Sequence, residues 1–350
     1  KRERSQKRSC HTLRMPVEIE EEDYSPSDLQ SPPVVEAKTV TLKVPIALSG
    51  SRLDQVLAEM LPEFSRSRLA ALAKAGHVTI DAKSGQPKTK LFGGEEIKAT
   101  LVPRDDELAF LPEDIALSVL YEDDAIIVID KPAGLVVHPG AGNWTGTALN
   151  ALLFRNPSVA NLPRAGIVHR LDKETSGVMV VAKTETAQLS LVRQLQARTV
   201  KRIYVALVRG QLPQEGTVEK PIGRHPHQRT KMAVMDDDEG QGGKSAVTHY
   251  RVRQRFKHHS FIECRLETGR THQIRVHMQS IGFPIEGDQV YSPGAAGVDA
   301  AMRDAFHKFG RQALHARELS FDHPVHGGGV TFEAKIPEDM RGLIDFVSGL

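Results

Sequence analysis

The apolar positions of residues 43–101 change from a helical to an alternating pattern. Two helical segments come first. Each is preceded by a serine, Ser51 or Ser65, a residue type that often caps the N-terminus of a helix. Apolar and polar residues then alternate at 78–80 and 97–101, which predicts short strands. We therefore expect a small module in which two helices pack on a sheet.

Beyond this module the chain shows short apolar runs that are separated by turns. The run at 126–129 leads into the turn-prone residues 132–134, which predicts a buried strand that ends in a loop. Two further apolar strands are expected at 167–168 and 178–182, and they enclose the polar sequence HRLDKETSG. A hairpin turn requires far fewer functional groups than this segment offers, so the segment is the best candidate for chemistry.

The N-terminal segment differs in composition from the rest of the chain. Residues 1–14 carry six basic residues and one acidic residue, whereas residues 15–36 carry seven acidic residues and no Lys or Arg. Such a segment buries too little apolar surface to offset the entropy of ordering it, so we expect disorder from residue 1 to about 40. The reversal of charge at Met15 suggests that translation starts there.

The overall composition excludes several classes of protein. No apolar run reaches the roughly 18 residues that a membrane span needs, so we expect no membrane protein. The two cysteines, Cys10 and Cys264, form neither a CxxC pair nor a disulfide framework, which favours a reducing, cytoplasmic compartment. Because 46 Lys and Arg face 44 Asp and Glu, a surface for nucleic acid would have to arise from local clustering of charge.

Other chemistries fit the sequence poorly. Residues 172–175 share part of the DKTGT order of transport ATPases, but the order is broken and no membrane domain accompanies it. The histidine pairs at 225/227 and 258/259 lack a cysteine or carboxylate at ligand spacing. No phosphate-binding glycine loop, dinucleotide fingerprint or GxSxG elbow occurs. We therefore expect no metal and no cofactor.

Residues 51–85 resemble the S4 RNA-binding domain. The likeness lies in the RLD start of the first helix, the SRS opening of the second and the strand GHVTID. It implies that the two helices and the following strand start grip structured RNA. Arg66 and Arg68, at the start of the second helix, are candidate phosphate contacts, since first-turn N–H groups also favour phosphate. By charge alone, a solvated helix face would look similar.

Most of the chain, from about 43 to 346, resembles the RluA family of pseudouridine synthases. Several separate motifs occur in the family's order, while the acidic loop 235–243 and the tail before residue 40 depart from its pattern. The matching segments are HRLDKETSG at 169–177, KRIYVALVRG at 201–210, RHPHQRTKMAV at 224–234, LETGRTHQIRVHM at 266–278, GDQVY at 287–291 and RQALHA at 311–316.

This resemblance implies an α+β protein. We expect an S4-like module at 43–101, a linker at 102–114 and, at 115–350, a catalytic domain with a mixed, mainly antiparallel sheet. The implied activity is isomerisation of specific uridines to pseudouridine in 23S ribosomal RNA, free or within a precursor of the large ribosomal subunit, by a monomer. Two alternatives are a tRNA pseudouridine synthase with the same catalytic residues and a non-catalytic RNA-binding or ribosome-assembly factor.

The resemblance also implies roles for individual residues. Asp172 matches the essential aspartate, which could attack the anomeric carbon, attack the pyrimidine ring or abstract a proton to form a glycal. Tyr204 matches the tyrosine that stacks on the uracil, and Arg275 matches the arginine that pairs with the aspartate. The uridine must leave its helix to be reached, and Arg170 matches the residue that fills the gap.

Further candidates for RNA contact are polar or basic residues of the same motifs. His169 belongs to the motif of the aspartate, and Arg270 and His272 would support their loop or touch phosphate. The other five would hold the phosphate backbone without reading sequence, although simple solvated charge explains them equally well. They are Lys201, Arg202, Arg224, Arg229 and Lys231.

Overall fold

The computed structural model describes most of the chain beyond residue 36, and the helix and strand assignments below refer to this part. Within it, no helix is long and apolar enough to cross a membrane. The expected start at Met15 and most of the expected disordered tail lie outside the described residues. Strand β1 (Lys38–Lys43) already includes residues 38–40, so the expected tail boundary at about 40 and the module start at 43 are too late. The described ranges are 37–103, 108–140, 142–228, 230–235, 242–292 and 300–349.

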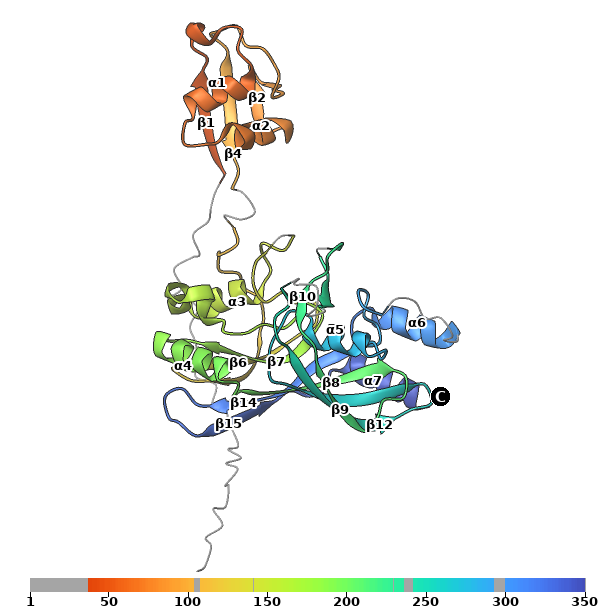
Figure 1. Cartoon of the computed structure of the whole chain (residues 1–350). Helices are drawn as coiled ribbons and strands as arrows, with labels where there is room; N and C mark the ends of the chain where they lie inside the picture. Colours follow the sequence, from red (N-terminus) through yellow and green to blue (C-terminus); the bar gives the residue numbers. More distant parts are fainter. Residues whose placement is uncertain are drawn as a thin grey trace, which may run out of the picture. The chain divides into compact units, whose positions relative to one another are not determined.

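The N-terminal part of the described chain is a four-stranded antiparallel sheet with two helices (Figure 1). The strand order is β1-β4-β2-β3, and the apolar sides of both helices contribute to the core of this part. Besides β1, its elements are α1 (Leu53–Met60), α2 (Arg66–Lys74), β2 (Val78–Ile80), β3 (Lys83–Ser84) and β4 (Glu96–Leu101).

One of the two predicted helix caps is correct. Ser65 precedes α2, and its hydroxyl accepts a hydrogen bond from the Arg68 amide at 3.3 Å. Ser51 is not the cap of α1, because the N-cap residue is Arg52, whose amide donates to the Gln55 side chain at 3.2 Å. The pattern therefore located both helices but misplaced the start of α1 by one residue.

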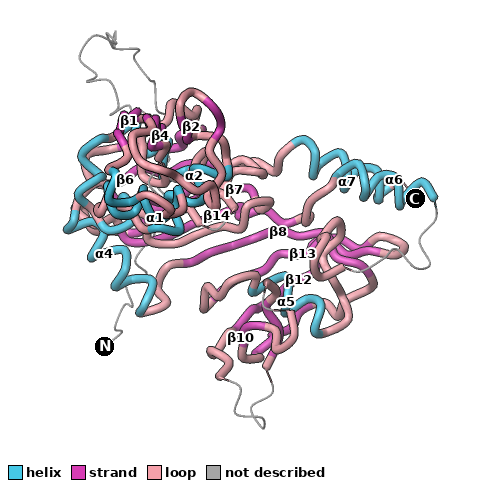
Figure 2. The backbone as a smooth tube through the Cα atoms, turned by 90° about the horizontal axis from the view of Figure 1, so that it is seen from above, coloured by secondary structure: helices cyan, strands magenta, loops and turns pink. Residues whose placement is uncertain are grey.

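The C-terminal part is built on a nine-stranded sheet in the order β5-β6-β7-β14-β8-β13-β12-β9, with β15 also paired to β14 (Figure 2). Strands β7 and β14 are parallel, and the other neighbours are antiparallel. The α+β class and the mixed, mainly antiparallel sheet are thus confirmed. The strands are β5 (Ser118–Glu122), β6 (Ile126–Lys131), β7 (Ser176–Ala182), β8 (Lys201–Arg209), β9 (Glu215–Glu219), β12 (Val247–Arg255), β13 (His259–Leu266), β14 (Leu314–Asp322) and β15 (Gly329–Glu333).

Helices cover this sheet, and a small hairpin stands beside it. One apolar cluster includes residues of α3, α5, α6 and α7 together with the sheet, and a second includes residues of α4. The hairpin consists of β10 (Ile222–Arg224) and β11 (Met232–Val234). The helices are α3 (Ala148–Arg155), α4 (Glu185–Gln196), α5 (Gln273–Ser280), α6 (Ala300–Phe309) and α7 (Glu338–Ser348), with 3-10 turns at Pro157–Asn161 and Pro163–Gly166. A further 3-10 turn, Ile46–Leu48, belongs to the N-terminal part.

The predicted linker 102–114 is shorter than expected. Residues 104–107 are not described, but Ala109 is buried, and the Asn150 side chain donates hydrogen bonds to the carbonyls of Ala109 and Leu111 at 3.2 and 2.8 Å. The Glu113 amide in turn donates to the Asn150 carbonyl at 3.1 Å. Residues from 108 onward therefore pack with α3 and belong to the C-terminal part.

The predicted strand at 167–168 is also incorrect. Ile167 forms only an isolated bridge to Val181, directly after residues 164–166, which all have positive φ. This left-handed turn cannot continue a strand, and it redirects the chain into the polar loop.

Glycines fix both ends of the polar loop. A side chain on Gly166 would collide with the carbonyl of Ala182, and one on Gly177 would collide with the carbonyl of Ala316. Both glycines also have positive φ, which other residues rarely adopt. The loop is thus held at each end by close approach of one backbone to another.

Candidate active site

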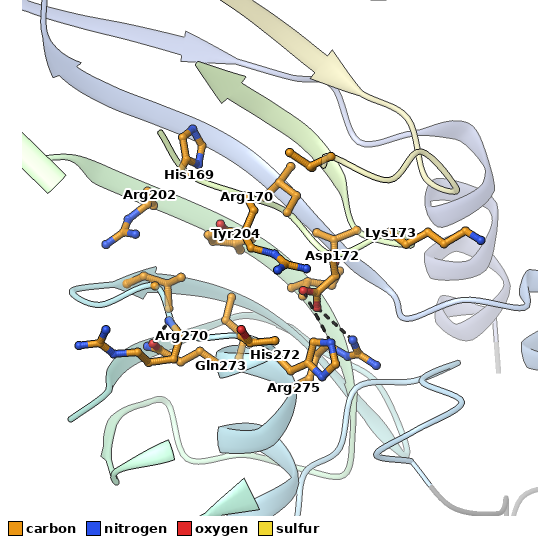
Figure 3. Close-up of a pocket in the computed structure, with 18 of the residues that line it drawn as sticks. His169, Arg170, Asp172, Lys173, Arg202, Tyr204, Arg270, His272, Gln273 and Arg275 are labelled. Carbon is orange, nitrogen blue, oxygen red and sulfur yellow. Dashed lines mark hydrogen bonds and ion pairs between the residues drawn. The ribbon is translucent and has the colours of Figure 1, made fainter. Parts of the chain in front are cut away.

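A cleft of about 1180 Å³ lies over the central strands (Figure 3). The polar loop before β7 and the segment before α5 both line it, and β8 contributes two side chains. It brings together eight of the residues that the sequence predicted, namely His169, Arg170, Asp172, Arg202, Tyr204, Arg270, His272 and Arg275.

Asp172 lies in a loop that a buried lysine holds in place. The Lys131 ammonium group, at the end of β6, donates to the carbonyls of Pro132, Leu135 and Lys173 at 2.7, 2.9 and 3.0 Å. Its burial lowers the pKa of Lys131 to about 8, against the attraction of nearby carboxylates. The sequence analysis missed Lys131, although a charged residue at the end of the apolar run 126–129 is a usable signal.

Arg275 joins Asp172 to a second carboxylate. Its Nη1 donates to Asp172 Oδ2 at 3.0 Å, while Nε and Nη2 bind both oxygens of Asp288 at 2.7 and 3.0 Å. Burial opposes the charge of Arg275, but hydrogen bonds to Asp288 and the nearby carboxylates raise its pKa above the usual value. The predicted pairing of Arg275 with Asp172 is therefore present, and Asp288 is a partner that the sequence analysis did not identify.

Tyr204 lies on β8, beside Arg170 and Asp172 in the close-up (Figure 3). Its side chain is buried, and burial raises the pKa of Tyr204 to about 12, with Arg202 opposing the shift and Asp172 adding to it. The hydroxyl is therefore protonated at neutral pH, and the ring lines the cleft where a base could stack on it.

Arg170 and His169 are neighbours in sequence with different surroundings. Arg170 is exposed and its guanidinium group points into the cleft (Figure 3). The His169 Nε2 accepts a hydrogen bond from the Val180 amide of β7 at 3.1 Å. Burial, followed by the charge of Arg202, lowers the pKa of His169 to about 3. A neutral ring bonded to β7 brings no positive charge to phosphate, so the geometry favours a loop-holding role over the predicted RNA contact.

His272 lies close to Asp172. It is the N-cap residue of α5 and has a left-handed backbone, with φ of 57°. Its Nε2 is 3.9 Å from Asp172 Oδ1, and its Nδ1 is 2.8 Å from the Tyr291 hydroxyl. Burial lowers the pKa of His272, while the charge of Asp172 opposes that shift.

The remaining basic candidates fall into three groups. Arg202 and Arg270 line the cleft and donate to the carbonyls of Glu267 and Ser245, both at 3.1 Å. Outside the cleft lining are Lys201, at the start of β8, and the hairpin residues Arg224 and Lys231, whereas Arg229 lies outside the described residues.

Arg66 and Arg68 belong to the N-terminal part. Arg66 forms an ion pair with the buried Asp54 at 2.8 Å but remains half exposed. Arg68 stacks on the Phe64 ring, with 4.8 Å to its centroid. Both side chains are thus partly engaged within the module that carries them.

One group of potential metal ligands occurs among the described residues, away from the cleft. Asp123, His323 and His326 bring their ligand atoms within 4.8 Å of one another. His323 Nε2 lies 2.9 Å from the Asp123 carboxylate, and its Nδ1 accepts from the amides of Val325 and His326 at 3.3 and 3.2 Å. These hydrogen bonds join the β5–β6 and β14–β15 turns, so the group is accounted for by the fold.

The chain is similar to known RNA-modifying enzymes. The family model for RNA pseudouridylate synthase matches residues 125–280. Ribosomal large subunit pseudouridine synthase D of Neisseria meningitidis is 55% identical over 326 residues, which make up 93% of this chain and 86% of that protein. The Escherichia coli protein of the same name is 50% identical over 300 residues, or 85% and 90% of the two chains. The solved structure of human RNA pseudouridylate synthase domain containing 4 aligns with a TM-score of 0.53 and 26% identity, over 66% of this chain and 92% of that one.

Proposed function

The chain belongs to the RluA family of RNA pseudouridine synthases, and from this premise we propose that it isomerises specific uridines in 23S ribosomal RNA. The relatives at 50–55% identity are named for the large ribosomal subunit, which supports this substrate over tRNA. The observation that carries the catalytic assignment is the 3.0 Å bond between Arg275 and Asp172, beside Tyr204 in one cleft. A purely RNA-binding protein has no need of such an arrangement.

In the proposed reaction, Asp172 acts on a uridine that has left its helix. The bond between uracil N1 and the sugar breaks, the base turns, and C5 bonds to the same sugar carbon. C5 then loses its proton and N1 ends with one, so the reaction is a balanced isomerisation without oxidant or reductant. Each of the three routes open to Asp172 uses the carboxylate form, whose Oδ2 accepts a hydrogen bond from Arg275 Nη1 at 3.0 Å.

Other residues of the cleft hold the substrate. The Tyr204 ring stacks on the uracil. Its protonated hydroxyl lies near the C5 atom that must lose a proton. Arg170, exposed in the cleft, fills the place that the flipped uridine leaves. Arg202 and Arg270, which line the cleft, contact phosphates of the RNA backbone, and Lys201, Arg224 and Lys231 extend this contact outside the cleft.

The N-terminal module adds affinity for RNA. Its two helices, the strand that follows them and the half-exposed Arg66 support an S4-like role in gripping structured RNA. We place the enzyme in the cytoplasm, acting as a monomer on ribosomal RNA or on a precursor of the large subunit, without metal or cofactor. Residues 38–101 form this module and residues from 108 form the catalytic domain.

The test is to map pseudouridine in RNA that has been treated with the purified full-length chain. Unmodified 23S RNA and total tRNA are incubated separately with wild type and with Asp172→Asn, and carbodiimide adducts are located by primer extension. We expect new stops at a few positions of 23S RNA with wild type alone. Stops in tRNA alone would show that the substrate is tRNA and not 23S RNA. The absence of stops in both RNAs would overturn the enzymatic assignment.

A further inference from the structure

Two residues connect the β10–β11 hairpin to the proposed catalytic carboxylate. The Met232 amide on β11 donates to the Tyr291 hydroxyl at 2.8 Å, and that hydroxyl is 2.8 Å from His272 Nδ1. The other ring nitrogen of His272 faces Asp172 Oδ1 at 3.9 Å. A chain of polar contacts therefore runs from the backbone of the hairpin to the oxygen of Asp172 that Arg275 does not bind.

The direction of the protons along this chain follows from the donors. Since the Met232 amide donates to the Tyr291 oxygen, the Tyr291 proton is available for His272 Nδ1. A neutral imidazole that accepts at Nδ1 carries its own proton on Nε2, which is the atom that faces Asp172. The opposite tautomer would direct a nitrogen lone pair at a carboxylate oxygen, which is unfavourable.

The same short segment also positions Arg275. Asp288 binds Nε and Nη2 of Arg275, and Asp288 Oδ1 accepts from the amides of Val290 and Tyr291 at 2.9 and 3.0 Å. The Tyr291 ring lies against the guanidinium group, 5.0 Å from its carbon. Residues 288–291 thus hold both side chains that approach the two oxygens of Asp172.

We propose that His272 is a positioning residue for Asp172, with its Nε2–H directed at Oδ1 by the Tyr291 hydroxyl. This inference rests on the proposed function and adds a second donor to the carboxylate. Arg275 holds Oδ2 at 3.0 Å, and a shift of about 1 Å brings His272 from 3.9 Å to hydrogen-bond distance of Oδ1. Tyr291 also packs with Ile222, Met232 and Val234, so the hairpin fixes the position of the hydroxyl that orients His272.

The first test reads the tautomer without RNA. Full-length protein labelled with ¹⁵N-histidine is studied by NMR, and the His272 signals are identified by their loss in His272→Gln. We expect a neutral ring with its proton on Nε2 in wild type, and a mixture of tautomers in Tyr291→Phe, which keeps the ring but deletes the hydroxyl. A proton on Nδ1 in wild type would overturn the proposal.

The second test measures single-turnover rates at saturating 23S RNA. Tyr291→Phe should lower the rate about tenfold with the Kd for RNA unchanged, since one hydrogen bond that orients the site is lost. His272→Gln should retain much of the rate, because its amide N–H can replace Nε2–H without help from Tyr291. Adding Tyr291→Phe to His272→Gln should then cost nothing further.

A matched control and the wild-type rate separate the possible outcomes. Tyr121→Phe removes another tyrosine hydroxyl, one that donates to Asp123 at 2.9 Å outside the cleft, and should leave the rate unchanged. Equal losses from Tyr291→Phe in both backgrounds would mean that Tyr291 acts only through the fold, which would overturn the positioning role while the function stands. Absence of pseudouridine with wild type would instead overturn the proposed function.

Discussion

Asp172 and Glu286 each meet one arginine and one histidine, yet they differ in what remains free. Glu286 is 1% exposed, accepts from Arg209 at 2.8 and 3.0 Å, and lies 3.1 Å from His259 Nε2. Asp172 is 16% exposed and accepts one bond from its arginine. Its histidine stays 3.9 Å away. The same residue types thus give a carboxylate with both oxygens occupied by hydrogen bonds at Glu286, and one with free acceptor capacity at Asp172.

The difference arises from how each arginine is used. Arg209 gives Nε and Nη2 to Glu286, whereas Arg275 gives the same two atoms to Asp288 and only Nη1 to Asp172. Asp288 thereby fixes the orientation of Arg275, and Asp172, which lines the cleft, keeps lone pairs that Arg275 does not occupy. The proposed catalytic carboxylate is therefore bound by an arginine that a second, buried carboxylate fixes in place.

The largest effect is expected from Asp172→Asn. The change keeps the shape but deletes the anionic form, so turnover of 23S RNA should fall about a thousandfold or more. RNA affinity and the thermal unfolding midpoint should stay close to wild type, because only one hydrogen bond from Arg275 is altered. Substantial conversion by a variant free of wild-type contamination and deamidation would remove Asp172 from the chemistry.

Glu286→Gln makes the same chemical change at the carboxylate with both oxygens occupied and should have the opposite result. The change puts a neutral amide against the Arg209 guanidinium group in a buried place, so the free energy of unfolding should fall by about 3 kcal/mol in urea denaturation. The single-turnover rate of the folded fraction should stay within about threefold of wild type. A rate loss comparable to that of Asp172→Asn would erase the distinction between the two sites.

Arg275 is expected to have the next largest effect on rate. Arg275→Met keeps bulk but deletes the charge beside Asp172, and should slow single turnover about a hundredfold at saturating RNA. Arg275→Lys retains the charge without the fork that binds Asp288, so it should recover part of the loss. Equal rates for the two variants would show that the geometry of the fork, rather than its charge, matters.

The smallest effect concerns His169, whose ring is held neutral by burial. With a pKa of about 3 in the fold and about 6.5 in the unfolded chain, His169 lets the unfolded state bind more protons below pH 6.5. The contribution of neutral His169 to the free energy of unfolding is therefore fully present above pH 6.5 and is lost as the pH falls. The loss amounts to about 2 kcal/mol at pH 5.

His169→Gln provides the matched comparison, since its carbonyl can still accept from the Val180 amide. Urea unfolding of both proteins at pH 7 and pH 5 should show a smaller loss on acidification in the variant. If both proteins lose the same stability, His169 takes up its proton in the folded state, and a charged contact with RNA becomes the better interpretation of this residue.

Motifs and apolar periodicity predicted much of this molecule. Periodicity gave the two helices of the small module, whereas the resemblance to the RluA family implied the mixed sheet and the gathering of Asp172, Tyr204 and Arg275 in one cleft. The helices depend on local spacing, and the other two features follow from sequence motifs that occur in the family's order.

The supporting contacts could not be predicted in the same way. Lys131 binds three backbone carbonyls, and any residue type provides a carbonyl, so the sequence carries no sign of its partners. Residues 108–114 have the composition of a linker, but their order comes from the amide of Asn150, about 40 positions away. Asp288 was within a recognised motif, yet its role depends on how Arg275 divides its donors.

The glycines at the two ends of the polar loop suggest how this enzyme could be re-engineered. Gly166 and Gly177 each approach a carbonyl of neighbouring backbone, so a larger side chain at either position would displace one end of the loop that carries Asp172. Within the loop, Leu171 and Thr175 are buried and the His169 ring is bonded to β7, so these positions also hold the frame. A library that varies the exposed positions Arg170 and Lys173 while keeping both glycines should therefore preserve the frame and change only the side chains that the loop presents to solvent.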